Sequence, residues 1–350
     1  MNRLNSDRIR IALAGCGGVA RKYRAAYRDI PGVSVQVAID VNALEAAAAR
    51  TETNALQAST DFTAALAEDI DAVVISTPNH LHCEQAVAAL KTGKHVLLQK
   101  PMAPSTAECD EILGAQRSSG ATLGIYMNLL DHPLFRDMER MVQEGFLGKV
   151  VLYSARLAHR GGLQWGGIER NWRASSVRTG GGSFIQLGVH YQFLMRLLLK
   201  AEVVKVQALS RNLACPHIEG DDLTLAQYEL SSGALGEIQT SWCCQEEHIS
   251  ILGTKGSIHY RDLRRIEYSG EGGSFDGEVL HLKGDGSPEV LEDCLSPEWG
   301  DASNQYNQHR RFVEALRKGR PPDVSGIEGR EDVRLVELCY ASSVQERAQA

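Results

Sequence analysis

Short apolar runs alternate with longer stretches of helical pattern through the first third of the chain. The runs are rich in valine and isoleucine and carry few polar positions. Such strands are buried on both faces, which is typical of a parallel sheet covered by helices. The pattern predicts a doubly wound α/β domain with right-handed crossovers. The expected strands are 9–14, 33–39, 70–76, 95–98 and 122–127, and the expected helices are 21–29, 41–50, 80–92 and 106–119.

The remainder of the chain has a different pattern, in which strand-like runs are joined by turns rich in glycine and serine. A chain of 350 residues is long enough for two domains of ordinary size. We therefore expect a first domain at 1–127 and a second at 128–350, with the last helix packed back near the first domain. The expected strands of the second domain are 150–158, 203–211, 223–230, 235–242 and 257–260, and its terminal helices are 306–318 and 327–347.

The composition is that of an ordinary soluble globular protein, with 43% hydrophobic and 23% charged residues. The net charge of −7 argues against nucleic acid or an anionic membrane as a partner. No apolar run approaches the roughly 18 residues that a membrane span needs, and the polar start leads directly into a strand, so we expect no secretory signal. The eight cysteines are scattered without a C-x-x-C pair, as is typical of reduced thiols. These features predict a cytoplasmic protein.

A glycine-rich stretch, GCGGVA at 15–20, follows the first expected strand and precedes a helical stretch. Gly15 permits a tight turn, Gly17 lets backbone N–H groups approach a pyrophosphate, and Ala20 allows close packing of helix on strand. The helix N-terminus then favours the negative charge of the phosphates. A purely structural glycine turn is the alternative, but the strand before the loop and the helix after it favour a dinucleotide site. The residues expected to bind the cofactor here are Gly15, Gly17, Gly18, Val19 and Ala20.

Asp40 lies at the end of the second expected strand. A carboxylate at this place accepts hydrogen bonds from the ribose 2′-hydroxyl and repels a 2′-phosphate. Residues 41–43 include no Arg or Lys that would hold such a phosphate. The sequence therefore predicts NAD rather than NADP, although Arg21 and Lys22 lie near the glycine loop and would weaken this preference.

Two further polar segments follow expected strands, at the carboxyl ends where open α/β sheets bind ligands. They are STPNHLH at 76–82 and QKP at 99–101. Together with the glycine loop they resemble the glucose–fructose oxidoreductase/inositol dehydrogenase (Gfo/Idh/MocA) family, whose members have T-P-N-x-x-H and E-K-P segments at comparable places. The resemblance covers nearly the whole chain. Its other segments are 132–150, 171–173, 180–190 and 251–260.

The resemblance implies a Rossmann domain followed by a C-terminal α/β domain with a large, mostly antiparallel open sheet. In this family the face of that sheet usually covers the nicotinamide site or packs against another subunit, so a homodimer or homotetramer through the C-terminal sheet is expected. The resemblance also implies cofactor contacts from the two polar segments. The residues concerned are Thr77, Pro78, Asn79, His82, Gln99 and Lys100.

Lys100 corresponds to the family's catalytic lysine. An ammonium group beside a reacting hydroxyl stabilises developing alkoxide charge, and a lysine of lowered pKa takes the proton itself. His190 lies four residues after Gln186, so a helix would place both side chains on one face, towards one substrate hydroxyl. The alternatives are a solvated lysine at a strand end and a histidine that is hydrogen-bonded at a helix start. Either Lys100 or His190 is the expected proton acceptor.

Two positions depart from the family's pattern. Gln99 stands where members usually have Glu before the lysine, and Gln186 stands where many have Asp. A glutamine cannot act as a general base, so proton abstraction would fall on His190, on Lys100 or on water. Because nearby carboxylates favour the cationic form of a lysine, their loss is expected to lower the pKa of Lys100. Such a site suits a neutral lysine as base, or an anionic substrate.

Aromatic and cationic residues of the second domain are candidates for substrate contacts. An indole stacks on the C–H face of a sugar, and a guanidinium binds hydroxyl or carboxylate oxygens. We recognise no histidine spacing typical of a metal site, and hydride chemistry with NAD requires no metal, so none is expected. The expected substrate-binding residues are Asn128, Trp172, Arg173, Gln186 and His190, with Arg160, Gln164 and Trp165 as weaker candidates.

These features predict an NAD-dependent oxidoreductase that acts on a hydroxyl or carbonyl group of a sugar, sugar derivative or cyclic polyol. One alternative is an enzyme that holds NAD tightly and recycles it within one turnover. Another is a non-catalytic regulator that senses NAD or a sugar on the same fold, since fold alone does not decide function. The presence of Lys100 and His190 argues against the regulator, whereas the two lost carboxylates keep it open.

Overall fold

The structure, a computed structural model, describes residues 8–131, 133–261, 265–270, 273–277, 280–282, 288–290 and 302–349. Its contacts divide the chain into two units. The first consists of Met1–Asn128 with Glu298–Glu331, and the second of Leu129–Pro297 with Asp332–Ala350. The expected division assigned all of 128–350 to the second domain, whereas the contacts group α8 (Ala302–Lys318) with the first. His132, part of one segment of the family resemblance, lies outside the described residues.

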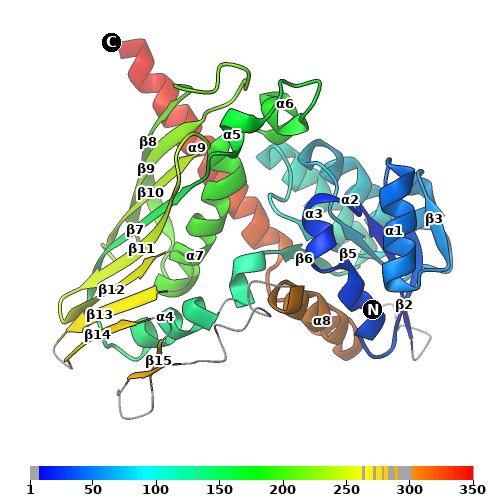
Figure 1. Ribbon diagram of the computed structural model, residues 1–350, viewed down its shortest axis with the longest axis horizontal. Coiled ribbons are helices and arrows are strands. Elements are labelled where there is room, and N and C mark those ends of the chain that lie inside the picture. The colour runs from blue at the N-terminus through cyan, green and yellow to red at the C-terminus, as the bar shows by residue number, and fades with distance from the viewer. Residues whose placement is uncertain are drawn as a thin grey trace. The chain divides into compact units, whose positions relative to one another are not determined.

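A six-stranded parallel sheet forms the centre of the first unit (Figure 1). Its order is β3-β2-β1-β4-β5-β6. Strands β2 and β3 are therefore added on one side of β1, and β4, β5 and β6 on the other. The four residues of β4 are all buried, as the apolar pattern requires. This confirms the predicted doubly wound domain. The strands are β1 (Ile9–Ala14), β2 (Val33–Ile39), β3 (Gln57–Ser59), β4 (Ala72–Ile75), β5 (His95–Gln99) and β6 (Leu123–Tyr126).

Helices α2 (His82–Lys91) and α3 (Thr106–Ser119) pack on each other over β4 and β5. Helix α1 (Ala43–Thr53) packs against the segment that follows the glycine loop. Its first turn is capped by Asn42, whose side chain accepts a hydrogen bond from the Leu44 N–H at 3.0 Å. The loop after β1 is thereby held between the sheet and α1.

The expected helix at 21–29 is instead two short 3₁₀-helices, η1 (Gly18–Lys22) and η2 (Arg24–Asp29). The break falls at Tyr23, whose backbone (φ −129°, ψ −18°) is not helical and whose ring is buried. A short 3₁₀ segment aligns fewer peptide dipoles than an α-helix. Its N-terminus therefore offers a phosphate less favourable charge than the sequence pattern suggested.

A buried aromatic cluster packs α8 against the rest of the first unit. The His309 ring lies 4.0 Å from the ring centroid of Tyr23 and 4.4 Å from that of Tyr126. Its Nδ1 lies 2.6 Å from the Tyr27 hydroxyl. Burial lowers the pKa of His309 to about 3. The imidazole is therefore neutral in the folded protein over the physiological range.

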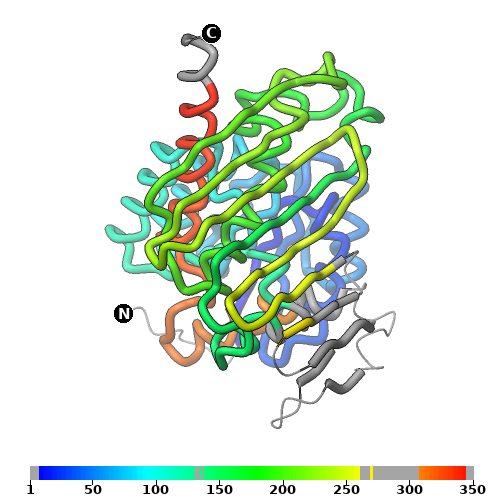
Figure 2. The backbone as a smooth tube through the Cα atoms, turned by 90° about the vertical axis from the view of Figure 1, so that its left-hand side faces the viewer, coloured from blue at the N-terminus to red at the C-terminus, as the bar shows by residue number. Residues whose placement is uncertain are grey.

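An eight-stranded sheet forms the second unit, with the order β14-β13-β12-β11-β7-β10-β9-β8. All neighbouring strands are antiparallel except β7 and β10, which are parallel. Figure 2 shows the strands from β12 to β8 side by side. The mostly antiparallel sheet that the family resemblance implied is thus confirmed. The strands are β7 (Val150–Ala158), β8 (Val203–Arg211), β9 (Leu223–Leu230), β10 (Leu235–Ser241), β11 (Glu246–Gly253), β12 (Gly256–Arg261), β13 (Arg265–Gly270) and β14 (Gly273–Gly277), with β15 (Leu280–Leu282) and β16 (Pro288–Val290) forming a separate pair.

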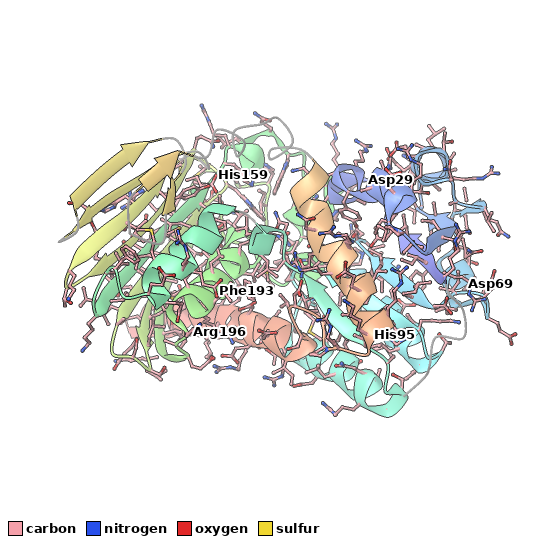
Figure 3. The ribbon with its side chains drawn as sticks, turned by 90° about the horizontal axis from the view of Figure 1, so that it is seen from below. Asp29, Asp69, His95, His159, Phe193 and Arg196 are labelled. Carbon is pink, nitrogen blue, oxygen red and sulfur yellow. The ribbon has the colours of Figure 1, made fainter. Side chains whose placement is uncertain are left out.

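Three helices cover one face of the large sheet: α4 (Pro133–Gln143), α7 (Val189–Leu199) and the second part of α9 (Gly326–Gln349). A largely buried ion pair joins two of them, because the guanidinium of Arg196 on α7, which Figure 3 labels, lies 3.1 Å from the Asp332 carboxylate on α9. The side chains on the other face of the sheet point into solvent. Along β9, for example, every second residue from Leu225 is exposed.

Asp221 holds the start of the segment that leads into α7. Its Oδ1 accepts hydrogen bonds from the Gly182 N–H at 2.9 Å and the Tyr340 hydroxyl at 2.6 Å. Its Oδ2 accepts from the Ser183 hydroxyl at 2.7 Å and the Phe184 N–H at 3.0 Å. A buried carboxylate at a helix start satisfies N–H groups that have no partner within the helix. Asp221 therefore fixes where this helix begins.

The glycines around Asp221 allow two backbones to touch. A Cβ atom on Gly182 would lie 2.0 Å from the Asp221 carbonyl oxygen. A Cβ atom on Gly220 would lie 2.6 Å from the Gly181 carbonyl carbon. No side chain fits at either position without moving backbone. The triple glycine at 180–182 is thus a close-packed contact, although its composition is typical of a flexible loop.

Replacing Asp221 by alanine is expected to lower the free energy of unfolding by about 3 kcal/mol or more, because several buried donors lose their acceptor at once. Asp221→Asn, which keeps one acceptor oxygen, should lose less. The measurement is chemical denaturation. Glu229→Ala, on the exposed face of β9, is the control and should cost less than about 1 kcal/mol. A loss for Asp221→Ala no larger than the control's would contradict this role.

The buried His309 predicts a loss of stability in acid. Its folded pKa of about 3 lies below the ordinary 6.5, so the unfolded chain binds a proton that the folded protein does not. Stability should therefore fall as the pH drops from about 6.5. In His309→Gln, the loss in unfolding free energy between about pH 7 and pH 5 should shrink by about 2 kcal/mol. Exposed His80→Gln is the control, and an equal change in both variants would refute the assignment.

Candidate active site

The glycine loop of the first unit turns where β1 ends. Gly15 has φ +82°, and its N–H donates to the Ile39 carbonyl at 2.8 Å. A Cβ atom here would lie 2.6 Å from the Ser76 carbonyl and 2.7 Å from the Thr77 nitrogen. Only glycine fits both the left-handed backbone and this close approach. The loop after β1 and the loop after β4 are therefore in direct backbone contact.

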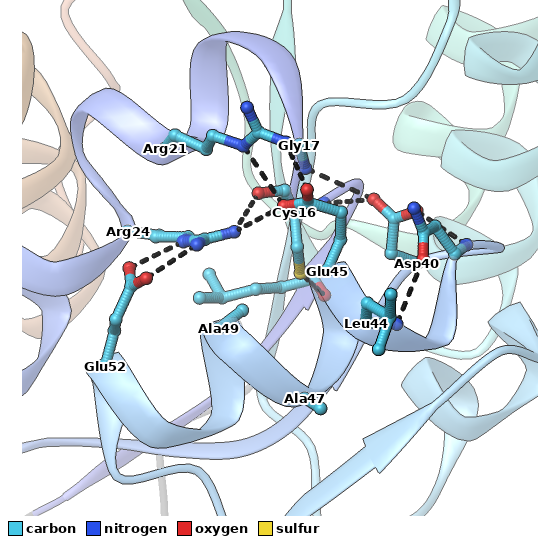
Figure 4. Close-up of polar contacts among 12 residues, drawn as sticks. Cys16, Gly17, Arg21, Arg24, Asp40, Leu44, Glu45, Ala47, Ala49 and Glu52 are labelled. Carbon is cyan, nitrogen blue, oxygen red and sulfur yellow. Dashed lines mark hydrogen bonds and ion pairs between the residues drawn. The ribbon is translucent and has the colours of Figure 1, made fainter.

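Asp40, directly after β2, anchors the glycine loop from its other side (Figure 4). Its Oδ2 accepts hydrogen bonds from the Cys16 N–H at 2.8 Å and the Gly17 N–H at 3.2 Å. Its Oδ1 accepts from the Asn42 N–H at 2.9 Å. Oδ1 accepts one hydrogen bond and so has a further lone pair, whereas Oδ2 already accepts two. The side chain, which is only half-buried, can thus hold the loop and still accept a hydrogen bond from a ligand.

Two arginines beside the loop are paired with carboxylates of α1 (Figure 4). Arg24 is almost fully buried, donates to Glu52 at 2.7 and 2.6 Å, and lies 3.1 Å from Glu45. It also donates to the Cys16 carbonyl. Arg21 is mostly exposed and pairs with Glu45. Sequence reasoning noted Arg21 but neither Arg24 nor the two glutamates, because the pairing joins residues more than twenty positions apart.

His82 joins the T-P-N loop to the Q-K-P loop. Its ring nitrogens lie 2.9 Å from the Thr77 carbonyl oxygen and 2.9 Å from the Pro101 carbonyl oxygen. The side chain is fully buried, and burial lowers its pKa to about 4. A neutral imidazole donates from one nitrogen only, so one of the two contacts is its hydrogen bond. The predicted cofactor-binding His82 is placed between the two loops that follow β4 and β5.

The other residues of these loops lie at the same edge of the sheet. Thr77 donates its hydroxyl to the Gln85 side chain at 2.7 Å, and Asn79 is buried at the start of the next helical turn. The Gln99 side chain is buried at the end of β5, and its Oε1 accepts the Lys100 N–H at 2.8 Å. Lys100 itself is half-buried. The carboxyl ends of β1, β2, β4 and β5 thus bring together the predicted cofactor residues and the predicted lysine.

Gln186 and His190 lie on one continuous helical segment of the second unit. Gln186 is within a π-helical turn, η7 (Phe184–Gly188), and His190 is in the first turn of α7. Both side chains are buried. Residues four apart on a helix share a face, and single π-turns occur often at functional sites. The helix that the sequence predicted for this pair is present, and its π-helical start was not predicted.

A second group of predicted residues lies in the loop region after β7. The Arg173 guanidinium carbon lies 4.4 Å from the centroid of the Trp172 ring, a cation–π contact. Burial lowers the pKa of Arg173. The pKa of His159 is also lowered, by burial and by the charge of Arg173. Sequence reasoning missed His159, although it directly precedes the candidate Arg160.

Trp165 packs edge-on against the buried Trp242, with ring centroids 4.7 Å apart. Asn128 begins the 3₁₀-helix η5 (Asn128–Asp131) and is half-buried. Gln308 on α8 holds β6, the strand that precedes Asn128, because its side-chain amide donates to the Ile125 carbonyl at 2.8 Å. Within the described ranges, His, Cys, Asp and Glu side chains form no group of three that could hold a metal ion, and no helix could cross a membrane.

Two family models match the chain. The first is described as an oxidoreductase family with an NAD-binding Rossmann fold, and it matches residues 9–127. The second is described as a GFO/IDH/MocA C-terminal domain, and it matches residues 135–259. The first range contains the glycine loop, Asp40, His82 and Lys100, and the second contains Gln186 and His190.

Curated proteins resemble the chain over about three quarters of its length. A scyllo-inositol 2-dehydrogenase (NAD(+)) of Bacillus subtilis strain 168 is 28% identical over 266 residues, covering 74% of this chain and 71% of that protein. A 1,5-anhydro-D-fructose reductase of Ensifer adhaerens is 27% identical over 257 residues, covering 73% of this chain and 76% of that protein.

Solved structures have the same fold. A levoglucosan dehydrogenase in complex with NADH and levoglucosan superposes with a TM-score of 0.86 over 97% of this chain and 98% of that one, at 20% identity. An aldose–aldose oxidoreductase from Caulobacter crescentus, in complex with glycerol, has a TM-score of 0.81 over 97% and 98% of the two chains, at 21% identity. Because the two models of one family together match the greater part of the chain, the protein belongs to the Gfo/Idh/MocA family of NAD-binding oxidoreductases.

Proposed function

We propose that the protein is an NAD-dependent dehydrogenase that interconverts a hydroxyl and a carbonyl group on a sugar, sugar derivative or cyclic polyol. The observation that carries this proposal is the fixed placement of Lys100. Its loop and the loop after β4 both contact the buried ring of His82, and the loop after β4 touches the glycine loop at Gly15. The lysine therefore stands at the sheet edge at which Asp40 and the glycine loop would hold a dinucleotide.

The residues present fit NAD as the cofactor. Gly15 supplies the tight turn, and a Cβ atom on Gly18 would meet nothing within 4 Å, so there is open space beside the loop. Asp40 offers a carboxylate lone pair to the ribose 2′-hydroxyl, and the same charge opposes a 2′-phosphate. When bound, NAD accepts a hydride from the carbon that bears the substrate hydroxyl. Thr77, Pro78 and Asn79 are proposed to line the nicotinamide end of the site.

Proton transfer is assigned to this chain's own side chains. Either Lys100 or His190 takes the hydroxyl proton as the carbonyl forms, and the two alternatives predict different pH profiles. Gln99 and Gln186 donate and accept hydrogen bonds but cannot take the proton. Gln99 instead orders the backbone at Lys100 through its 2.8 Å contact. The amides are thus proposed to position the reacting groups.

Substrate binding is proposed for Trp172 and Arg173. The stacked pair offers an aromatic face for sugar C–H groups and guanidinium N–H donors for oxygens. The names of the relatives point to inositols and to anhydro sugars as substrates to test first. Assembly into a homodimer or homotetramer through the exposed face of the eight-stranded sheet is part of the same proposal, supported by the exposed Leu225 and Leu235.

The test is NADH formation with free NAD across a panel of inositols, anhydro sugars, aldoses and their oxidised forms. Net NADH with one substrate class supports the proposal. Denaturing the purified protein and assaying the supernatant for NAD separates the alternatives. Tightly held NAD with sugar interconversion but no net NADH identifies the recycling enzyme. Sugar and NAD binding without any turnover identifies the regulator and overturns the proposal.

Replacing Lys100 by methionine, or His190 by asparagine, should lower kcat by about 10²-fold to 10⁴-fold, because each removes a group that handles the proton. The dissociation constant for NAD should change little. The variant that also flattens the acidic limb of the kcat/KM profile identifies the proton acceptor. Lys91→Met, at the exposed end of α2, is the control. Activity near that of the wild type in both site variants would exclude the assigned roles.

Gln99→Glu restores a carboxylate beside Lys100 while keeping an oxygen for the Lys100 N–H. A negative neighbour favours the cationic lysine, so the acidic limb of kcat/KM should move to higher pH by about one unit if neutral Lys100 is the base. Gln116→Glu on α3 is the control and should leave the profile in place. A Gln186→Asp variant that gains activity on the same substrate with an unchanged profile would count against the neutral-lysine hypothesis.

A further inference from the structure

Arg21 is a cation near the glycine loop that would raise the affinity for NADP relative to NAD if its side chain were free to bind a 2′-phosphate. It lies one residue after the glycine motif, on η1, and its side chain is 59% exposed. Its charge interacts with Asp40, which is where the ribose 2′-position of a bound dinucleotide would lie. Arginine at such a place is a ready partner for a 2′-phosphate, because its fork of N–H donors binds phosphate oxygens bidentately.

In this structure one edge of the Arg21 guanidinium is already occupied. Its Nε donates to Glu45 Oε2 at 3.1 Å, and its terminal nitrogen contacts Glu45 Oε1 (Figure 4). The pKa of Arg21 is raised, first by this hydrogen bond and then by the charge of Glu45. The pair is bidentate, so the edge of the guanidinium formed by Nε and one terminal nitrogen points at a carboxylate and is not available to a phosphate.

Glu45 cannot readily follow Arg21 into solvent, because a second arginine holds it. Arg24 lies 3.1 Å from Glu45 Oε2, and its own side chain is 5% exposed. Arg24 in turn donates to Glu52 at 2.7 and 2.6 Å and to the Cys16 carbonyl. The carboxylate that pairs with Arg21 is therefore part of a partly buried network between the glycine loop and α1, in which Arg24 is the buried member.

Glu45 also stands on the same side of the loop as Asp40. A Cβ atom built on Gly17 would lie 3.9 Å from Asp40 Oδ2 and 3.9 Å from Glu45 Cγ. Two carboxylates thus flank one glycine of the dinucleotide loop. A 2′-phosphate approaching Asp40 would meet a guanidinium that is already paired with a carboxylate.

We propose that Glu45 is a second determinant of cofactor specificity, which excludes NADP by keeping Arg21 from a 2′-phosphate. The inference rests on the NAD preference in the proposed function and adds to it a residue outside the dinucleotide motif. Arg21 without Glu45 would favour NADP. The repulsion of a 2′-phosphate by Asp40 would then be offset by the attraction of the nearby Arg21 cation.

The experiment measures binding without substrate or turnover. Isothermal titration gives the dissociation constants of adenosine 5′-monophosphate and adenosine 2′,5′-bisphosphate, and of NAD and NADP, for the purified protein. Glu45→Gln keeps the size of the side chain and removes its charge. We expect the variant to bind the 2′-phosphorylated ligands about tenfold more tightly relative to their unphosphorylated partners than the wild type does.

Two further variants make the result specific. Glu52→Gln removes the same charge from the same helix but leaves the Arg21–Glu45 pair, so its binding ratio should stay within about twofold of the wild type's. Arg21→Met should leave the wild-type ratio nearly unchanged and abolish the gain in the Glu45→Gln background. An equal shift in Glu45→Gln and Glu52→Gln, or a gain that survives Arg21→Met, overturns the proposal.

Failure of the proposed function is read separately. A wild type that binds NADP as tightly as NAD contradicts the NAD preference, whatever Glu45→Gln does. An absence of oxidation across the sugar panel contradicts the proposed reaction and leaves the binding ratios intact. Folding of each variant is checked by its thermal unfolding midpoint, and because every conclusion uses a ratio of two ligands on one protein, a general loss of stability does not imitate the expected shift.

Discussion

The first unit depends on one buried imidazole. His82 lies between two carbonyl oxygens, one in the loop after β4 and one in the loop after β5. Neighbouring parallel strands end side by side, but their loops are otherwise free to diverge. The fully buried ring packs between the two loops, and as a neutral imidazole it donates a hydrogen bond to one of them. Backbone contact at Gly15 then extends this connection to the loop after β1. The segment that contains Lys100 and the glycine loop are therefore linked through the loop after β4.

The strands of this unit could be predicted because burial on both faces leaves a continuous apolar run. Residues 72–75 are all buried, and their run was visible in the sequence. β3 was missed because its three residues, Gln57–Ser59, lie mostly exposed at the sheet edge and carry no such run. The 3₁₀-helices were missed for another reason. Their pattern suits an α-helix, and the break at Tyr23 coincides with packing of its ring against His309, which is 286 positions away.

The candidate site divides in the same way. Motif residues such as Gly15, Asp40 and Lys100 could be located because each follows a strand whose end is recognisable. The residues that form ion pairs and hydrogen bonds around this site could not be predicted from the sequence. Glu45 is an unremarkable first-turn glutamate of α1 until the fold brings Arg21 to it. Likewise the placement of His82 follows from distant backbone carbonyls, which leave no mark in composition or spacing.

The backbone contact between Gly182 and Asp221 changes how sequence variation in this chain should be interpreted. Residues 180–182 have the composition of a hinge, but no side chain fits at Gly182, and the backbone of residues 220–221 occupies the space beside it. A saturation library would find few tolerated substitutions there. Intolerance of that kind is commonly attributed to contact with a ligand. Here it would report the packing of one main chain on another, so a mutational map of the second unit would overstate the extent of its binding surface.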